Sequence, residues 1–319
     1  MDNNHLISIV VIFLNSAKFI DEAIASVFAQ TWDSWELLLV DDGSTDASVE
    51  ISRKYAERFP GRISYLEHPG HQNRGMSASR NLGVKHAKGD LIAFLDSDDV
   101  WLPEKLETQV ALMDAHPAAA MVYGSSQYWY SWTGETADLG RDFVPAVGVE
   151  TERVYMPPAL LTLSLKSICR TPCPSDFLVR HDVVKEVGGF DEQFRGDLSL
   201  FEDQAFLAKV FLKRPVYVTQ LCLDRYRRHP DSCVSVAAQR GTKHYTGLRY
   251  FRRLQEYLRA QEVTDAELWK ALRNKRFRYR QAAVYHALAR ARTHVSRLKS
   301  GVLDIAKRSL LHSFRRQFR

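Results

Sequence analysis

The sequence predicts an α/β fold: a mixed, mostly parallel sheet flanked by helices, followed by a C-terminal helical extension. Three observations support this prediction. Buried-strand patterns alternate with amphipathic helix patterns over the first 123 residues, which indicates parallel strands joined by crossover helices. The length of 319 residues suits one large domain plus an extension, or two domains. From residue 241 onward, Gly is scarce and the pattern is helical.

Short, continuous apolar runs rich in β-branched residues predict the strands, because strands of parallel sheets are buried on both faces. These runs lie at 6–14, 36–41, 63–67, 90–95 and 120–123. Helices are predicted between them. Apolar residues on one face predict a helix at 18–30, and segment 43–59 begins with turn and cap residues and continues as a helix. Further helices are predicted at 77–87 and at 103–116, where Pro103 suits the first turn. Ligands of such sheets bind beyond the carboxyl ends of the strands, so the residues after each strand are the expected site of chemistry.

The second part of the chain is less regular. Residues 124–175 are rich in aromatic residues, Gly and Pro, and are predicted to form an irregular insertion or long loop. Order is predicted to return over 176–218, with a strand, a short helix, a turn and a helix from Glu202 to Lys213. The sequence therefore divides into a domain over 1–240 and a helical extension over 241–319.

The composition excludes several classes of protein. With 45% hydrophobic and 26% charged residues, the chain is neither collagen-like nor disordered. Four Cys are too few for a disulfide scaffold and lack zinc-site spacing, so reduced thiols are expected. No apolar stretch approaches the about 18 residues of a membrane span, and no secretion signal pattern begins the sequence. We therefore expect a cytoplasmic chain that is not integral to a membrane.

The charge is divided unevenly along the chain. Residues 241–319 hold 20 Lys and Arg against 5 Asp and Glu, a net +15, so the whole-chain value of +6 leaves −9 for residues 1–240. Segment 298–318 has apolar residues at mostly four-residue spacing, flanked by basic ones, as interfacial helices do. This predicts contact with an anionic membrane surface. Packing on the domain and an oligomer contact are the alternatives, and without a reading motif nucleic acid is not expected.

Carboxylates follow two of the predicted strands. Asp41 and Asp42 end one strand, and Asp96, Asp98 and Asp99 end another. Mutual repulsion makes the second cluster costly unless a cation or hydrogen-bond donors relieve it, and such ligands suit Mg²⁺ or Mn²⁺ shared with substrate phosphates. Turn and cap chemistry is the alternative. Neither a dinucleotide-binding glycine fingerprint nor a P-loop is present, which argues against those two nucleotide-binding classes.

Six strings together carry a resemblance: ISIVVIFLN near the N-terminus, VDDGSTD at 40–46, SASRNLGVKHAKGDLIAFLDSDDVWLPEKL at 77–106, GGFDE at 188–192, FED at 201–203 and YRRHPDS at 226–232. Over about 6–235 the chain resembles a family 2 glycosyltransferase with the Rossmann-like GT-A fold. The resemblance implies a nucleotide-sugar half at about 1–123 and an acceptor half at about 124–240. It further implies transfer of a sugar from a nucleotide-diphosphate sugar, often UDP-linked, to an acceptor hydroxyl, usually with inversion.

The resemblance also implies roles for individual residues. The nucleotide sugar would be bound by Asn15, Asp42, Arg80, Asp96 and Ser97. Asp98 would hold a divalent cation, Mn²⁺ or Mg²⁺, with His229 reaching the metal or the diphosphate. Asp203 would be the general base, and Glu202 would orient it or contact the acceptor. The alternatives are acids at a helix N-terminus for the last pair and a solvated basic loop for His229.

The sequence alone is compatible with other interpretations. The string Ile12-Phe13-Leu14 before Asn15 departs from the family pattern and leaves the nucleobase undetermined. Five aromatic residues either stack on sugars or pack in the core: Tyr123, Tyr128, Trp129, Tyr130 and Trp132. An inactive scaffold or glycan-binding module is the main rival to an enzyme of cell-surface polysaccharide or glycolipid synthesis with a glycan or lipid-linked acceptor. A sugar nucleotidyltransferase is less consistent with the sequence, because the loop after the first strand is not Gly-rich.

Overall fold

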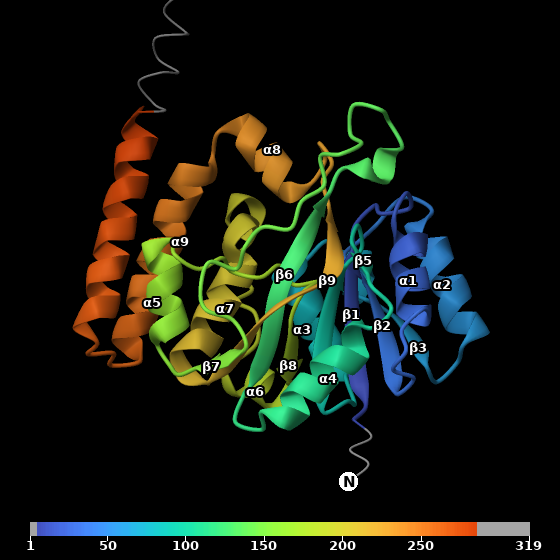
Figure 1. Cartoon of the computed structure of the whole chain (residues 1–319). Coiled ribbons are helices and arrows are strands. Elements are labelled where there is room, and N and C mark those ends of the chain that lie inside the picture. Colours follow the sequence, from blue (N-terminus) through green and yellow to red (C-terminus); the bar gives the residue numbers. More distant parts are fainter. Residues whose placement is uncertain (1–4, 286–319) are drawn as a thin grey trace, which may run out of the picture.

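A computed structural model describes residues 5–285 of the chain as a curled mixed sheet with helices on both faces (Figure 1). The sheet order is β3-β2-β1-β4-β8-β6-β9-β5, with β7 paired to β9. The strands are β1 (Ile7–Phe13), β2 (Trp35–Asp41), β3 (Ile63–Glu67), β4 (Leu91–Asp96), β5 (Val100–Trp101), β6 (Met121–Trp129), β7 (Arg153–Tyr155), β8 (Leu178–Arg180) and β9 (Val216–Arg227). The longest ladders, β1 with β2 and β4, β2 with β3, and β6 with β9, are parallel.

The helices follow the predicted alternation in the first part of the chain. They are α1 (Ile20–Phe28), α2 (Ser48–Arg58), α3 (Met76–His86), α4 (Lys105–Ala115), α5 (Ala159–Lys166), α6 (His181–Glu186), α7 (Glu202–Lys213), α8 (Cys233–Arg240) and α9 (Lys243–Ala260). A further helix spans residues 266–285 of the described chain. The predicted strands and helices of residues 6–116 are confirmed, with ends that differ by a few residues.

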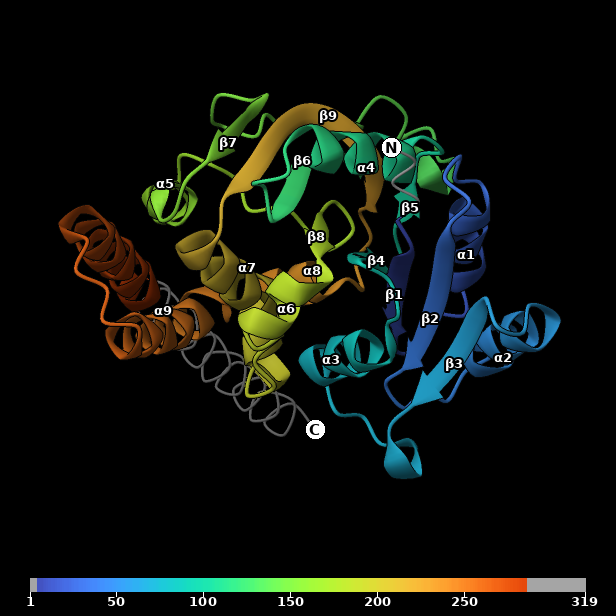
Figure 2. The ribbon, with the colours of Figure 1, turned by 90° about the horizontal axis from the view of Figure 1, so that it is seen from below.

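Alternation along β1 divides the core between the two faces of the sheet. Ile9 and Val11 pack in a cluster with α1 and α4, whereas Val10 and Ile12 pack in a second cluster with α3 and α7. Seen from below, α1 and α2 lie on one side of the parallel strands and α3 on the other (Figure 2). Helices on both faces explain why β1 and β2 are buried at every position.

An aromatic cluster fixes α7 against the sheet. The Phe190 and Phe206 rings stack with centroids 4.3 Å apart, and Phe94 of β4 contacts both edge-on, at 5.2 and 6.4 Å. Such aromatic pairs are each worth about 0.5–1.5 kcal/mol beyond the area they bury. The cluster therefore sets where the first turn of α7, with Glu202 and Asp203, lies relative to the end of β4.

The prediction that 124–175 is irregular is wrong in part. β6 continues to Trp129 as a partner of β9, and the segment also contains β7 and α5. Pairs such as Tyr128 with Tyr226 join residues almost a hundred positions apart, so no local pattern marks this strand. The long strand β9 escaped prediction for the same reason.

The described part of the extension packs on the domain. Phe251 and Leu254 of α9, with Leu268 and Leu272 of the following helix, belong to the same core cluster as α7. Helix is confirmed here as far as residue 285, and segment 298–318 lies outside the described residues. None of the described helices combines the length and the apolar character that a membrane span requires.

Gly83 allows α3 to approach β1 closely, and replacing it tests this packing. A Cβ at this position would lie 2.4 Å from Cγ1 of Val10. Overpacking costs about 1–3 kcal/mol, more than the about 1 kcal/mol that Ala gains over Gly in a helix. We expect Gly83→Ala to lower the free energy of unfolding by about 1 kcal/mol, and by at most about 2 kcal/mol, in denaturant titrations. Lys85→Ala, at an exposed site on the same helix, should change the free energy of unfolding by less than about 0.5 kcal/mol. Equal effects of the two substitutions would show that the close packing of α3 on β1 does not depend on Gly83.

Candidate active site

The loops that follow β1, β2 and β4 meet at one edge of the sheet, which we call the carboxyl edge. The backbone N–H of Asn15 donates to Ser44 Oγ over 2.9 Å, and Asn15 Oδ1 accepts from the N–H of Thr45 over 2.7 Å. The hydroxyls of Ser16 and Ser97 lie 2.7 Å apart. Asn15 has φ +54°, a left-handed conformation that Asn adopts more readily than most residues. Side chains thus join all three loops, and Asn15 and Ser97 lie at their junctions.

Asp42 holds the loop that follows β3. Its carboxylate, only 5% exposed, accepts from the backbone N–H groups of Arg74, at 2.7 Å, and Gly75, at 3.0 Å. Gly43 allows the close approach, since a Cβ there would lie 2.8 Å from the Asn73 nitrogen and its φ is +87°. Asp41, fully buried, accepts from the Ser44 N–H and the Tyr65 hydroxyl. Much of the VDDGSTD motif therefore has a structural role in this loop.

Arg80 connects the end of β4 with the start of helix α7. Its guanidinium is 2% exposed and pairs with Asp96 at the end of β4, over 2.7 Å, and with Glu202 at the start of α7. Burial raises the pKa of Glu202, and the Arg80 charge opposes that rise. Glu202 Oε2 is buried without a hydrogen-bond partner among the described residues. The three side chains form a charged triad at the carboxyl edge, in which Arg80 and Glu202 are buried and Asp96 is partly exposed.

Asp98 and His229 come together from distant parts of the chain. Asp98 Oδ2 lies 2.9 Å from His229 Nε2, and the other ring nitrogen, Nδ1, is buried without a partner in the described chain. Asp98 keeps 29% of its side chain exposed, so a ligand can reach the carboxylate. A carboxylate oxygen is a ligand that suits Mn²⁺ or Mg²⁺, and the imidazole nitrogen beside it can serve as a second ligand.

Arg227 and Ser175 fix the acidic loop from behind. The Arg227 N–H donates to Asp99 Oδ1 over 2.9 Å, and its Nε donates to the carbonyl of Asp98 over 2.7 Å. The Ser175 hydroxyl donates to Asp99 Oδ2 and accepts from the Asp96 N–H. Burial, with the charges of Asp98 and Asp96, raises the pKa of Asp99 well above its usual range.

Asp203 follows Glu202 in the first turn of α7 and is partly exposed. Its carboxylate accepts from the backbone N–H of Gln204 over 2.6 Å. Burial is the main cause that raises the pKa of Asp203 to about 6. A carboxylate that titrates close to neutral pH and remains accessible has the properties of a general base.

Aromatic rings surround the Arg227 guanidinium next to Asp98. The ring centroids of Phe19, Trp129 and Trp132 lie 4.9, 4.4 and 5.0 Å from its central carbon, and Phe19 contacts the His229 ring at 5.0 Å. The other aromatic candidates pack differently: Tyr123 in the core, Tyr128 on Phe143 and Tyr226, and Tyr130 on Arg141. The aromatic wall beside the acidic loop therefore consists of Trp129, Trp132 and Phe19.

Sequence reasoning missed the anchoring residues. Arg227 had a weak signal, because it lies in the basic run before His229. Ser175 had none, since it lies in a segment predicted to be irregular. Its position at the carboxyl edge depends on the antiparallel pairing of β8 with β4.

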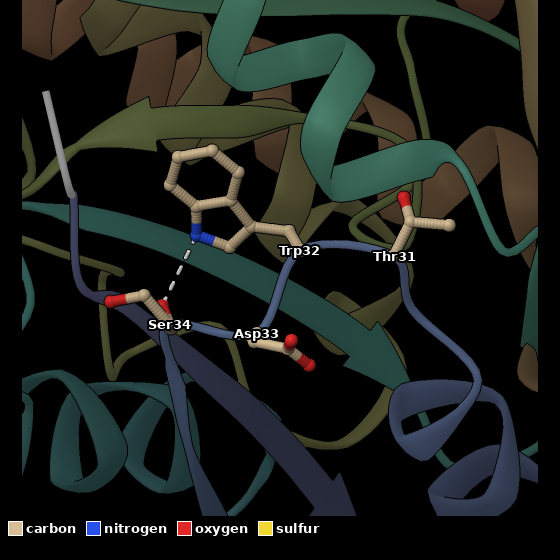
Figure 3. A pocket seen from close by; sticks show the side chains of 4 residues that line it. All are labelled: Thr31, Trp32, Asp33 and Ser34. Carbon is tan, nitrogen blue, oxygen red and sulfur yellow. Dashed lines mark hydrogen bonds between the residues drawn. The ribbon is translucent and has the colours of Figure 1, made fainter. Parts of the chain in front are cut away.

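Two other features do not belong to this site. Asp41, Glu67 and His71 offer ligand atoms within 4.8 Å of one another, but the Tyr65 hydroxyl donates to both carboxylates and His71 bonds the Ser44 carbonyl. These hydrogen bonds explain why the three side chains lie close together without a bound cation. A pocket lined by Thr31, Trp32, Asp33 and Ser34 precedes β2, at the opposite edge of the sheet (Figure 3).

Comparisons with known proteins identify the family and the fold. A family model described as glycosyl transferase family 2 matches residues 8–188. Similar curated proteins include the putative glycosyltransferase EpsE of Bacillus subtilis (35% identical; 36% of this chain, 41% of EpsE). Another is the UDP-Glc:α-D-GlcNAc-diphosphoundecaprenol β-1,3-glucosyltransferase WfgD of Escherichia coli (39% identical; 35% and 42%). This chain thus spans less than half the length of these relatives.

Solved structures share the fold at low sequence identity. Staphylococcus aureus TarS 1–349 with UDP-GlcNAc superposes with a TM-score of 0.56 at 22% identity, over 72% of this chain and 60% of that one. Mannosyltransferase PcManGT of Pyrobaculum calidifontis, with GDP-Man and Mn²⁺, gives 0.57 at 17% identity, over 90% and 75%. Because the family model covers more than half of the chain and the sheet matches these structures, the protein belongs to glycosyl transferase family 2 and has the GT-A fold.

Proposed function

We propose that this protein transfers a sugar from a nucleotide-diphosphate sugar, a UDP-sugar by preference, to an acceptor hydroxyl at the carboxyl edge. The observation that carries the proposal is the meeting of Asp98 and His229 beside Asp96, with Asp203 on the helix tied to Asp96 through Arg80. The names of WfgD and TarS 1–349, which mention UDP-Glc and UDP-GlcNAc, support this donor class.

The donor is proposed to lie over the loops after β1, β2 and β4. Two backbone N–H groups hold Asp42, and its remaining lone pairs can accept from the N–H of a base. Asp96 binds Arg80 with one oxygen and keeps 25% of its side chain exposed for a ribose hydroxyl, beside Asn15 and Ser97. Arg80, at 2% exposure, acts through Asp96 and Glu202 and is a positioning residue.

Asp98 and His229 are the proposed holders of the divalent cation, Mn²⁺ or Mg²⁺. Once bound, such an ion neutralises the charge that develops on the leaving nucleoside diphosphate. Arg227 keeps the Asp98 backbone in place, and the Phe19 ring limits the movement of His229. Asp98 and His229 thus present one carboxylate oxygen and one imidazole nitrogen in a fixed arrangement.

Asp203 is proposed to take the proton from the acceptor hydroxyl. Inversion needs one base on the face opposite the leaving group, and Asp203 is the accessible carboxylate of its pair. Glu202 is 3% exposed, so we propose that it positions Arg80 and does not contact the acceptor. The acceptor is proposed to be a glycan or lipid-linked saccharide at the cytoplasmic face of a membrane. A role in polysaccharide or glycolipid synthesis is supported by the names of two relatives, WfgD and the putative teichuronic acid biosynthesis glycosyltransferase TuaG of Bacillus subtilis.

A panel of nucleotide sugars tests the proposed reaction. We expect one donor to release nucleoside diphosphate with Mn²⁺ or Mg²⁺ and not with EDTA. Asp98→Asn should lower the rate of nucleoside diphosphate release at least about 100-fold, because a bound cation stabilises the transition state by several kcal/mol. Asp90→Asn, a charge-matched control at an exposed site, should keep the activity. If the protein binds none of the nucleotide sugars, the proposal is contradicted and an inactive scaffold is favoured.

Asp203→Asn separates transfer from donor binding. We expect the Kd for nucleoside diphosphate to change by less than about threefold and the transfer rate to fall about 10²–10⁴-fold, the usual contribution of a general base. Asp197→Asn, at an exposed acid just before α7, serves as the control. Loss of nucleotide binding in Asp203→Asn would instead make Asp203 a donor-binding or structural residue.

The pH dependence of kcat/KM reports the protonation of Asp203. The base must be ionised, and its pKa is raised to about 6. Activity should therefore be level above this pH and fall about tenfold per unit below it. Nucleotide binding measured over the same range separates this effect from loss of the metal site. Activity that rises as the pH falls would rule out Asp203 as the base.

A further inference from the structure

The helix of residues 266–285 has one face in the core and one face in solvent. Leu268, Ala271, Leu272 and Ala283 are at most 4% exposed, and the first three belong to the core cluster that contains α9. Figure 1 shows this helix as the outermost layer, beyond α5 and α9. Its outward face has no protein partner among the described elements.

The outward face combines basic and apolar side chains. At alternating spacings of three and four residues it presents Lys270, Arg273, Phe277, Arg280 and Val284, which we call the outer stripe. Residues at these spacings share one face of a helix. Phe277 is 60% exposed and Val284 is 53% exposed, whereas a helix that only covers a domain turns such side chains inward.

Positive charge dominates the outer stripe. The acids near it, Glu262, Asp265 and Glu267, lie at the turn before the helix and in its first turn, and residues 268–285 contain none. Beyond residue 285 the sequence adds nine Lys and Arg and one acid, Asp304. The stripe therefore belongs to a strongly basic part of the chain.

The position of the helix relates the stripe to the active site. The described part of the helix reaches the edge of the molecule where α8 lies, and α8 directly follows the His229 loop (Figure 1). On α9, the Tyr245 hydroxyl donates to the carbonyl of Ala283, so a second exposed aromatic ring lies beside the helix end. A binding partner with a flat surface that covers the outer stripe would therefore lie next to the carboxyl edge.

We propose that the outer stripe docks on an anionic lipid bilayer. Phe277 and Val284 would enter the headgroup region, and Lys270, Arg273 and Arg280 would contact anionic headgroups, as in interfacial helices. Charge complementarity favours this partner over a second copy of the stripe, because two such stripes would repel each other. The surface goes beyond the proposed transfer reaction and would keep a membrane-borne acceptor close to the carboxyl edge.

Cosedimentation of the full chain with vesicles tests the docking surface. Vesicles of phosphatidylcholine are compared with vesicles that contain about 30% phosphatidylglycerol, at about 0.05 M and about 0.5 M NaCl. The full chain should bind only the anionic vesicles, and less at high salt. The triple variant Lys270→Gln, Arg273→Gln, Arg280→Gln and the variant Phe277→Ser, Val284→Ser should each lose at least about tenfold in vesicle affinity.

A matched control carries the same loss of charge away from the stripe: Lys54→Gln, Arg58→Gln and Lys85→Gln. Its vesicle affinity should change less than about twofold. Unchanged melting temperatures verify folding, since all replaced side chains of the stripe are exposed. Equal binding to neutral vesicles, equal losses in control and test variants, or a dimer that the triple variant dissociates would overturn the proposal. Vesicle binding requires no transfer, so its failure and that of the proposed reaction are distinguishable.

Discussion

A buried guanidinium ties the two parts of this molecule together. Arg80 lies between Asp96, which ends β4, and Glu202, which begins α7, and its ring contact with Phe190 adds apolar cover. Removal of one member of such a group leaves an uncompensated buried charge, which costs about 3–5 kcal/mol. The donor loops and the helix that carries Asp203 therefore have to come together in one arrangement.

The remaining constraints support the same edge of the sheet. Parallel strands direct β1, β2 and β4 to one edge, so three loops meet there and bond one another through Asn15 and Ser16. Asp42 adds the loop after β3 by accepting from the N–H of Arg74. β9 then brings Arg227 and His229 to the acidic loop from the other side of the sheet. A loop of three acids is tolerated because Arg80 donates to Asp96, and the backbone N–H of Arg227 and the Ser175 hydroxyl donate to Asp99.

Local patterns explain which parts of this arrangement the sequence could predict. The strands and helices up to residue 116 show strong periodicity, so their positions followed from the residues alone, as did the acids at the ends of β2 and β4. The far part of β6 and all of β9 form through pairing between distant segments, which leaves no periodic signal. The partners of Arg80 and the role of Ser175 depend on that pairing. The helical prediction for the extension held through residue 285, but only the structure shows which face is turned outward.

The proposed role of Asp98 and His229 is to hold the cation of a nucleotide-sugar site at the carboxyl edge. A crystal structure of the chain soaked with Mn²⁺ and a nucleoside diphosphate, with anomalous data at the manganese edge, tests this role most directly. We expect an anomalous peak in contact with Asp98 Oδ2 and His229 Nε2, with the diphosphate beside it. A peak at Asp41, Glu67 and His71, or a nucleotide bound away from the carboxyl edge, would contradict it.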